Sequence, residues 1–178
     1  MMEPAKVTIF TIGHSIRSFE QLIELLNTHG VDCLIDIRTV PKSRQNPQFD
    51  LATIEKELPR LEIEYRHMKS LGGLRHPKEN SINTGWEDAG FRGFADYMQT
   101  ADFSKALKSL MALAYDQQIA IMCAEANPYR CHRILVADAL TVRGIEVRHI
   151  TSLIAASRHR LTPFALINGD QITYPNIP

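Results

Sequence analysis

The chain has 178 residues, of which 44% are hydrophobic and 22% charged, and its 20 basic and 20 acidic residues cancel. This balance is typical of a globular domain and excludes a protein held on nucleic acid or on an anionic membrane by its overall charge. Three cysteines are too few for a disulfide framework, and no long apolar segment predicts a signal peptide or a membrane span. We therefore expect a cytoplasmic protein with reduced thiols and no membrane association.

The first part of the chain alternates β-rich runs with an amphipathic segment. Val7–Ile12 is rich in β-branched residues and predicts a strand, and Val31–Ile37 predicts a second, buried strand. Between them, Ser18 and Gln21 form a capping box at the start of a helix that Gly30 ends. The pattern is strand, helix, strand.

The middle of the chain is less regular. Residues 38–49 contain two prolines and no periodicity, which predicts a loop, and Asp50 then caps a short helix that Pro59 follows. Ile63–Met68 alternates apolar and polar residues, as a partly exposed strand does. Residues 71–86 form the longest irregular segment, and a loop of this length is typical of a lid or a binding loop.

Helical and strand patterns continue toward the second half. Phe91–Gln99 predicts a short helix, and Asp102 caps a longer one. Ile119–Ala124 predicts a buried central strand, after which Asn127-Pro128 predicts a helix start, with asparagine as N-cap and proline in the first turn. The first turns of that helix would contain Cys131, His132 and Arg133.

The last part of the chain predicts a strand and a hairpin. The helix that starts at Asn127 would end at Gly144, and Ile145–Ile150 reads as another strand. Asn168-Gly169 lies between two strand-like runs and predicts a tight turn. Because strands alternate with helices at least four times, we expect one α/β domain over residues 1–178, with three α/β/α layers, a mostly parallel sheet and a C-terminal hairpin.

Polar or reactive side chains follow most of the predicted strands. In a parallel sheet the carboxyl ends of the strands meet at one edge, where open α/β proteins bind ligands. The residues that leave these ends are His14 and Ser15, Asp36 and Arg38, Gly72 and Gly73, Cys123 and Glu125, and His149. This coincidence predicts a functional site at that edge.

Cys123 is the candidate nucleophile of this site. A thiol at a strand end, facing a helix N-terminus and nearby arginines, has its thiolate favoured, and His14 or Glu125 would carry the proton. The alternative is that Cys123 is a small buried hydrophobe, since cysteine is among the most buried residues. Cys33, inside the second strand, is expected to belong to the core.

The layout of an Asp-x-Arg after strand two and a later Cys loop is similar to that of rhodaneses and Cys-based phosphatases, which surround an anion with loop amides. Here six residues separate Cys123 from Arg130, one more than in the phosphatase signature, and Glu125 lies inside the loop. A carboxylate repels an anion unless a cation neutralises it. Glu125 is therefore either a general acid/base or the partner of Arg38, Arg130 or Arg133 in an ion pair.

A metal site is a further alternative. Cys123, Cys131 and His132, with His14 or His149, supply the donor atoms that zinc prefers. The two cysteines are not paired at the short spacing of common zinc motifs, so we assign no metal ligand and expect no cofactor.

A nucleic-acid surface is the last alternative. Lys42, Arg44 and Gln45 lie in one loop, and the arginines after Tyr129 add positive charge that can follow a phosphate backbone. No signature of an RNA- or DNA-binding module is present. The sequence does not indicate an oligomeric state.

The chain contains, in this order, the motifs TIGHS, DIRTVPKSR, RHMKSLGG, GFADYM and CAEANPYRCHR. With these motifs it resembles the family called domain of unknown function 488 from about Thr11 to about Ile150, which leaves residues 151–178 as a C-terminal extension. The resemblance implies a compact α/β domain with clustered motif residues, and some members of the family carry a DNA-repair label. The motif residues are His14, Ser15, Asp36, Arg38, Pro41, Ser43, Gly72, Gly73, Cys123, Glu125, Cys131, His132 and Arg133.

We therefore expect an enzyme that acts on a small anionic, phosphate- or nucleotide-like substrate at the carboxyl edge of the sheet. Cys123 or Glu125 would do the chemistry and His14 would move a proton. The expected substrate-binding residues are Ser15, Asp36, Arg38, Ser43, Gly72, Gly73, Cys131, His132 and Arg133. The alternatives are a non-catalytic module that binds nucleic acid or a protein partner, associated with DNA repair, and a metal-binding protein.

Overall fold

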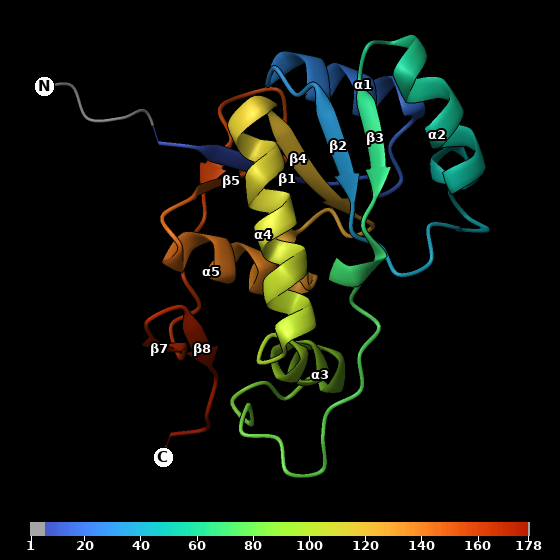
Figure 1. Cartoon of the computed structure of the whole chain (residues 1–178). Helices are drawn as coiled ribbons and strands as arrows, with labels where there is room; N and C mark the ends of the chain where they lie inside the picture. Colours follow the sequence, from blue (N-terminus) through green and yellow to red (C-terminus); the bar gives the residue numbers. More distant parts are fainter. Residues whose placement is uncertain (1–5, 178) are drawn as a thin grey trace, which may run out of the picture.

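Six strands form a mostly parallel sheet in the computed structural model, which describes residues 6–177 (Figure 1). The strands are β1 (Thr8–Gly13), β2 (Cys33–Asp36), β3 (Glu64–His67), β4 (Ile119–Cys123), β5 (Glu146–Ile150) and β6 (Ser157–Arg158). Their order across the sheet is β3-β2-β4-β1-β5-β6, and only the β5–β6 pair is antiparallel. The predicted mixed α/β fold with a mostly parallel sheet is confirmed.

The helices lie in two layers, one on each face of this sheet. They are α1 (Phe19–Thr28), α2 (Leu51–Arg60), α3 (Ala89–Tyr97), α4 (Ala101–Asp116) and α5 (Arg133–Val142). Leu34 of β2 packs in a core with α1 and α2, whereas the next residue, Ile35, packs in a second core with α3, α4 and α5. Successive strand residues point to opposite faces, so one strand supplies both cores. All four residues of β2 are buried, as expected for a strand covered on both sides.

The helix ends follow the predicted chemistry only in part. Ser18 and Gln21 form the capping box of α1. Thr100 is the N-cap of α4, because its Oγ1 accepts a hydrogen bond from the amide of Phe103, and Asp102 lies in the first turn. Pro59 lies inside the last turn of α2 and does not follow the helix.

The predicted helix start at Asn127-Pro128 is wrong. Pro128–Arg130 forms only a 3-10 turn, η3, in which the Asn127 side chain accepts a hydrogen bond from the Tyr129 amide. Cys131 then takes an extended conformation, with φ −140° and ψ 155°, and α5 begins at Arg133. The Cys131 Sγ accepts a hydrogen bond from the Arg133 amide, so the sulfur takes part in capping α5.

The C-terminal hairpin is present, with its turn one residue later than predicted. β7 (Leu166–Asn168) pairs with β8 (Gln171–Thr173), and Asn168 belongs to the ladder opposite Gln171. The turn is Gly169-Asp170, and Gly169 has φ +62°, a value that glycine adopts without steric cost. Within residues 6–177, no helix is long and apolar enough to cross a membrane.

Asp96 of α3 fixes the long irregular segment that precedes this helix. Its carboxylate, on a residue that is 5% exposed, accepts hydrogen bonds from the Lys78 amide, the Ser81 hydroxyl and the Asn83 side chain. Although burial opposes ionisation, these hydrogen bonds lower the pKa of Asp96. The Asn83 Oδ1 in turn accepts a hydrogen bond from the Tyr174 amide, and this bond connects the segment to the C-terminal part of the chain.

Replacing Asp96 by alanine is expected to destabilise the fold by about 2 kcal/mol, because three donors lose a buried acceptor. Proteolysis should accelerate first between residues 75 and 88. Urea unfolding and limited proteolysis measure both effects, with Asp102→Ala on the exposed first turn of α4 as the matched control. Equal stability of the two variants would contradict this account.

Candidate functional site

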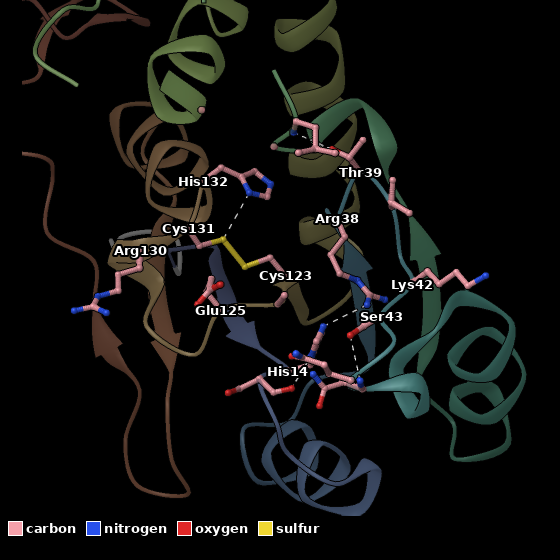
Figure 2. A pocket seen from close by; sticks show the side chains of 18 of the residues that line it. His14, Arg38, Thr39, Lys42, Ser43, Cys123, Glu125, Arg130, Cys131 and His132 are labelled. Atoms are coloured by element: carbon pink, nitrogen blue, oxygen red, sulfur yellow. Dashed lines mark hydrogen bonds between the residues drawn. A yellow bond between two sulfur atoms is a disulfide. The ribbon is translucent and has the colours of Figure 1, made fainter. Parts of the chain in front are cut away.

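A cavity of about 630 Å³ opens where β1, β2 and β4 end, and we call it the strand-edge cavity (Figure 2). Nine of the twelve residues predicted for the site line it: His14, Ser15, Arg38, Ser43, Gly73, Cys123, Glu125, Cys131 and His132. Asp36, Gly72 and Arg133 lie outside its lining. Thr39, Lys42 and Arg130, which were not among the twelve, also line it.

The register of the parallel strands explains why distant motifs meet here. Gly13 of β1 pairs with Cys123 of β4, so both strands end at the same level. The amide of His14 then donates to the Cys123 carbonyl at 3.0 Å, and the amide of Ser15 donates to the Ala124 carbonyl at 2.8 Å. The two loops therefore leave the sheet side by side. A Cβ on Gly13 would lie 1.7 Å from the Glu125 carbonyl oxygen, so only glycine allows this approach.

Arg38 is held by a carboxylate that is fully buried. Its Nε donates to Asp36 Oδ1 at 2.9 Å and its Nη2 donates to Asp36 Oδ2 at 2.6 Å. The Arg38 amide and Tyr65, from the edge strand β3, also donate to Asp36. Nη2 also donates to the Phe49 carbonyl and Nη1 to His14 Nε2, which leaves one Nη1–H without an acceptor within residues 6–177. Asp36 neutralises most of this arginine's charge.

His14 orients Arg38 and is itself neutral. Its Nδ1 donates to the Ser15 carbonyl at 2.9 Å, so its Nε2 is the acceptor that faces Arg38 Nη1 at 3.3 Å. The ring stacks on Phe49 with 4.6 Å between centroids. Burial, with the neighbouring Arg38 charge, lowers the pKa of His14. The geometry favours a positioning role for His14 over the proton transfer predicted from the sequence.

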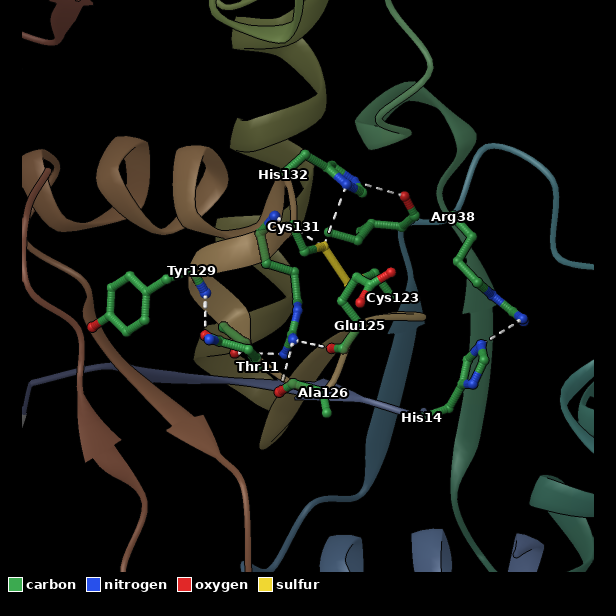
Figure 3. Close-up of a disulfide and its surroundings, with 12 residues drawn as sticks. Thr11, His14, Arg38, Cys123, Glu125, Ala126, Tyr129, Cys131 and His132 are labelled. Atoms are coloured by element: carbon green, nitrogen blue, oxygen red, sulfur yellow. Dashed lines mark hydrogen bonds between the residues drawn. A yellow bond between two sulfur atoms is a disulfide. The ribbon is translucent and has the colours of Figure 1, made fainter. Parts of the chain in front are cut away.

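Arg133 is the largest fully buried side chain, and within residues 6–177 no carboxylate lies within ion-pair distance of it. Its Nη1 donates to the Thr11 hydroxyl, and its Nη2 donates to the carbonyls of Glu125 and Ala126 (Figure 3). Its Nε has no partner in the described part of the chain. Burial lowers the pKa of Arg133 to about 10, so the group is still a cation at neutral pH.

Cys123 and Cys131 form a disulfide between the end of β4 and the start of α5 (Figure 3). The expectation of reduced thiols is therefore wrong for these two residues. The cause is the loop between them, which Arg133 holds folded back so that both sulfurs reach the same wall of the strand-edge cavity. Cys33 is free and buried in β2, as predicted.

His132 lies directly beside the Cys131 sulfur. Its Nε2 is 3.0 Å from the carbonyls of both Ile37 and Leu71 and must donate to them, so its Nδ1 is an acceptor, 3.6 Å from Cys131 Sγ. Burial lowers the pKa of His132 to about 4. A Cβ on Gly73 would lie 2.5 Å from Nδ1, so this glycine leaves room for the imidazole.

The Glu125 side chain is exposed and lines the strand-edge cavity close to the disulfide (Figures 2 and 3). The ion pairs predicted with Arg38, Arg130 or Arg133 are absent among the described residues, because Arg133 contacts the main-chain carbonyl of Glu125 and Arg38 is taken up by Asp36. The carboxylate is left facing the cavity, which is where an acid or base must lie.

Gly72 has a packing role, because a Cβ there would lie 2.3 Å from Thr39 Oγ1. Thr39 Oγ1 accepts the Leu74 amide and thereby holds the loop after Gly73. Ser43 also acts on the main chain: its hydroxyl accepts the Asn46 amide, while its own amide donates to Asp50. These contacts shape the cavity wall on the side opposite the disulfide.

His149 does not reach the strand-edge cavity and belongs to a buried hydrogen-bond chain. The Thr11 hydroxyl is 2.6 Å from His149 Nδ1, and His149 Nε2 is 2.9 Å from His159 Nδ1. His159 Nε2 is 2.7 Å from the Asp138 carboxylate, which also accepts the Tyr174 hydroxyl. The Thr11 hydroxyl also accepts a hydrogen bond from Arg133 Nη1, so this buried series of hydrogen bonds fixes one of the acceptors of Arg133.

No group of three or more His, Cys, Asp and Glu side chains within residues 6–177 is arranged to hold a metal ion. Of the three histidines proposed as zinc ligands, His14 faces Arg38 and His149 faces His159, whereas His132 lies beside the Cys131 sulfur. The metal hypothesis therefore gains no support.

The sequence reasoning missed Tyr65, Phe49 and Thr11. Tyr65 lies on a half-exposed edge strand, and Phe49 acts on Arg38 through its carbonyl, so neither leaves a signal in the residue pattern. Thr11 is the first residue of the TIGHS motif, but its residue type gives no hint of its contact with Arg133. Lys42 and Arg130 also lie within the motifs that carry the resemblance.

The protein is expected to lose about 2 kcal/mol of stability between pH 7 and pH 5 through His132 alone. The folded-state pKa, about 4, lies below the ordinary histidine value of 6.5, so the unfolded chain binds the proton first as the pH falls. Urea unfolding of His132→Gln, which keeps a donor for the two carbonyls, should show a smaller loss over this interval. The exposed His76→Asn should behave like the wild type, and an unchanged pH profile of His132→Gln would contradict the assignment.

Comparison with known proteins gives a family and no activity. No curated protein and no solved structure matches the chain. The model of the family described as "Domain of unknown function DUF488" matches residues 18–140, a range that begins just after His14 and Ser15 and includes Cys123, Glu125, Cys131, His132 and Arg133. Because this match covers more than half of the chain, the protein belongs to the DUF488 family.

Proposed function

We propose that the protein is an enzyme that acts on a small anionic, phosphate- or nucleotide-like substrate through a cysteine thiolate in the strand-edge cavity. The observation that carries this proposal is the sharing of one cavity by Cys123, Cys131, Glu125 and His132. A nucleophile, an acid/base and an imidazole that orients the thiol, all in one cavity, are components of covalent catalysis.

Cys131 is the better nucleophile of the pair. Its sulfur accepts the Arg133 amide at 3.5 Å at the N-terminus of α5, where the helix dipole favours negative charge. His132 Nδ1, 3.6 Å away, has a free lone pair that can accept a hydrogen bond from the thiol and orient the sulfur, while its low pKa keeps the ring from holding the proton. The helix N-terminus and the charge of Arg133 favour a thiolate at Cys131. Cys123, at the end of β4, then serves as the disulfide partner.

The catalytic cycle begins with reduction of the disulfide. The thiolate of a small cellular thiol attacks one sulfur and displaces the other, and a second thiol releases the reduced protein as its own disulfide forms. The Cys131 thiolate then attacks the electrophilic atom of the substrate, and the leaving group departs with its electron pair and a proton from Glu125. The Glu125 carboxylate next takes a proton from water, whose oxygen attacks the intermediate and releases Cys131 as a thiolate.

The preference for an anion follows from the charges around the cavity. Arg133 is a buried cation without a carboxylate partner within residues 6–177, and its field is only weakly screened. Lys42 and Arg130 add positive charge at the lining, and Arg38 offers one free N–H. The Glu125 carboxylate opposes an anion, and the cationic groups around the cavity offset this repulsion.

We also propose a cytoplasmic location for the protein. Cytosolic disulfides in most organisms are transient and catalytic or redox-sensing, because cellular thiols reduce them. The Cys123–Cys131 bond is then the resting, oxidised form of the site.

In the reduced protein, iodoacetamide is expected to alkylate Cys131 at neutral pH at least ~10-fold faster than Cys33, and millimolar inorganic phosphate should slow the reaction. Cys33 is an internal control, because burial raises the pKa of its thiol to about 12. Mass spectrometry of peptides follows each cysteine. Cys123→Ser should keep the fast reaction.

Alkylation of Cys131 that is slow and confined to alkaline pH would remove the nucleophile from this proposal. A fast reaction that phosphate does not slow would support the Cys131 thiolate but contradict the proposal that the substrate is an anion.

A further inference from the structure

A second cavity, of about 810 Å³, lies on the other side of η3 from the strand-edge cavity, and we call it the aromatic cavity. Tyr129 lines it, whereas the next residue, Arg130, lines the strand-edge cavity. Of the residues that line it, only Tyr129 lies within a motif of the family resemblance. We propose that the aromatic cavity binds a mononucleotide, with the base among its aromatic side chains and the phosphate at its arginines.

Aromatic rings form the wall that would receive the base. Trp86, Tyr129 and Phe164 line the cavity, and Trp86 meets Phe164 edge to face with 4.8 Å between centroids. The Tyr129 side chain is 41% exposed, and its ring lies nearly parallel to the His159 ring, at an interplanar angle of 15°. A nucleobase on such rings gains about 1–3 kcal/mol from stacking.

Two polar groups at this wall have no hydrogen-bond partner within residues 6–177. They are the indole Nε1–H of Trp86 and the Oγ1 of Thr162, and both residues line the cavity. Both atoms are enclosed within the wall, so a ligand in the cavity meets the aromatic rings and not these two groups.

Two arginines supply the charge for a phosphate. Arg158 and Arg160 line the cavity and are exposed. Arg158 makes only a long contact with Glu146, at 3.8 Å, and Arg160 has no ion pair within the described residues. Guanidinium groups bind phosphate with two parallel hydrogen bonds, and these two are free to do so.

The side of the cavity behind His159 is rigid. His159 donates to Asp138 and faces His149, and the Thr162 amide also donates to Asp138. The backbone that presents Arg160 and Thr162 is thus fixed before a ligand arrives, which reduces the entropic cost of binding.

Trp86 is the single tryptophan of the chain, so its fluorescence reports on this cavity. We expect AMP to quench it saturably, adenosine to bind about tenfold more weakly, and inorganic phosphate to have no effect at the same concentration. Arg160→Gln should weaken AMP toward the affinity of adenosine and leave adenosine unchanged. Tyr129→Leu should weaken both ligands about fivefold or more. Arg44→Gln, which removes the same charge outside both cavities, should change neither.

The proposal is overturned by quenching that does not saturate or by an AMP affinity that Arg160→Gln leaves unchanged. It is also overturned if a single-stranded oligonucleotide binds much more tightly than AMP, since an extended nucleic-acid surface would then be the site. If AMP slows the alkylation of reduced Cys131 by iodoacetamide, and slows it equally in Arg160→Gln and in the wild type, the nucleotide lies in the strand-edge cavity and the proposal is also overturned. None of these readouts uses catalytic activity, so they are independent of the proposed enzyme.

Discussion

A buried guanidinium holds the candidate site together. Arg133 is fully enclosed and donates to carbonyls of Glu125 and Ala126 and to the hydroxyl of Thr11, which ties the loop after β4 to β1 and α5. Neutral acceptors receive the hydrogen bonds of its Nη1 and Nη2 without cancelling its charge, and its Nε has no partner within residues 6–177. The cost of burying a cation in this way is several kcal/mol, so the arrangement persists only because the surrounding contacts fix it. The Arg133 amide meets the Cys131 sulfur at the same point.

The two buried arginines of the motifs have different parts in the site. Arg38 forms a bidentate pair with Asp36 and is thereby neutralised, so it shapes the cavity and orients His14. Arg133 has no such partner among the described residues and leaves a positive field beside Cys131. That positive field favours both a thiolate at Cys131 and an anionic ligand in the cavity. The same charge therefore relates the cysteine pair to the proposed class of substrate.

Periodicity and capping residues were sufficient to predict the layers of the fold, because apolar alternation in strands and helices depends on local sequence. Parallel strand ends also placed His14, Arg38 and Cys123 at one edge correctly. The disulfide and the start of α5 were not predictable in this way: Asn127-Pro128 is a strong helix signal, and only the long-range hold of Arg133 on the loop bends Cys131 back toward Cys123. Contacts made by main-chain carbonyls do not depend on the residue type, so residue patterns do not predict them.

The central claim is that Cys123 and Cys131 are a reversible pair in one cavity and that Cys33 is not part of it. Peptide mapping by mass spectrometry, after equilibration in glutathione buffers of increasing oxidation, tests this most directly. The account predicts a single intramolecular bond between Cys123 and Cys131 that forms and is lost reversibly, with Cys33 a free thiol throughout. Glutathione attached separately to both cysteines without that bond, or a bond that includes Cys33, would contradict it.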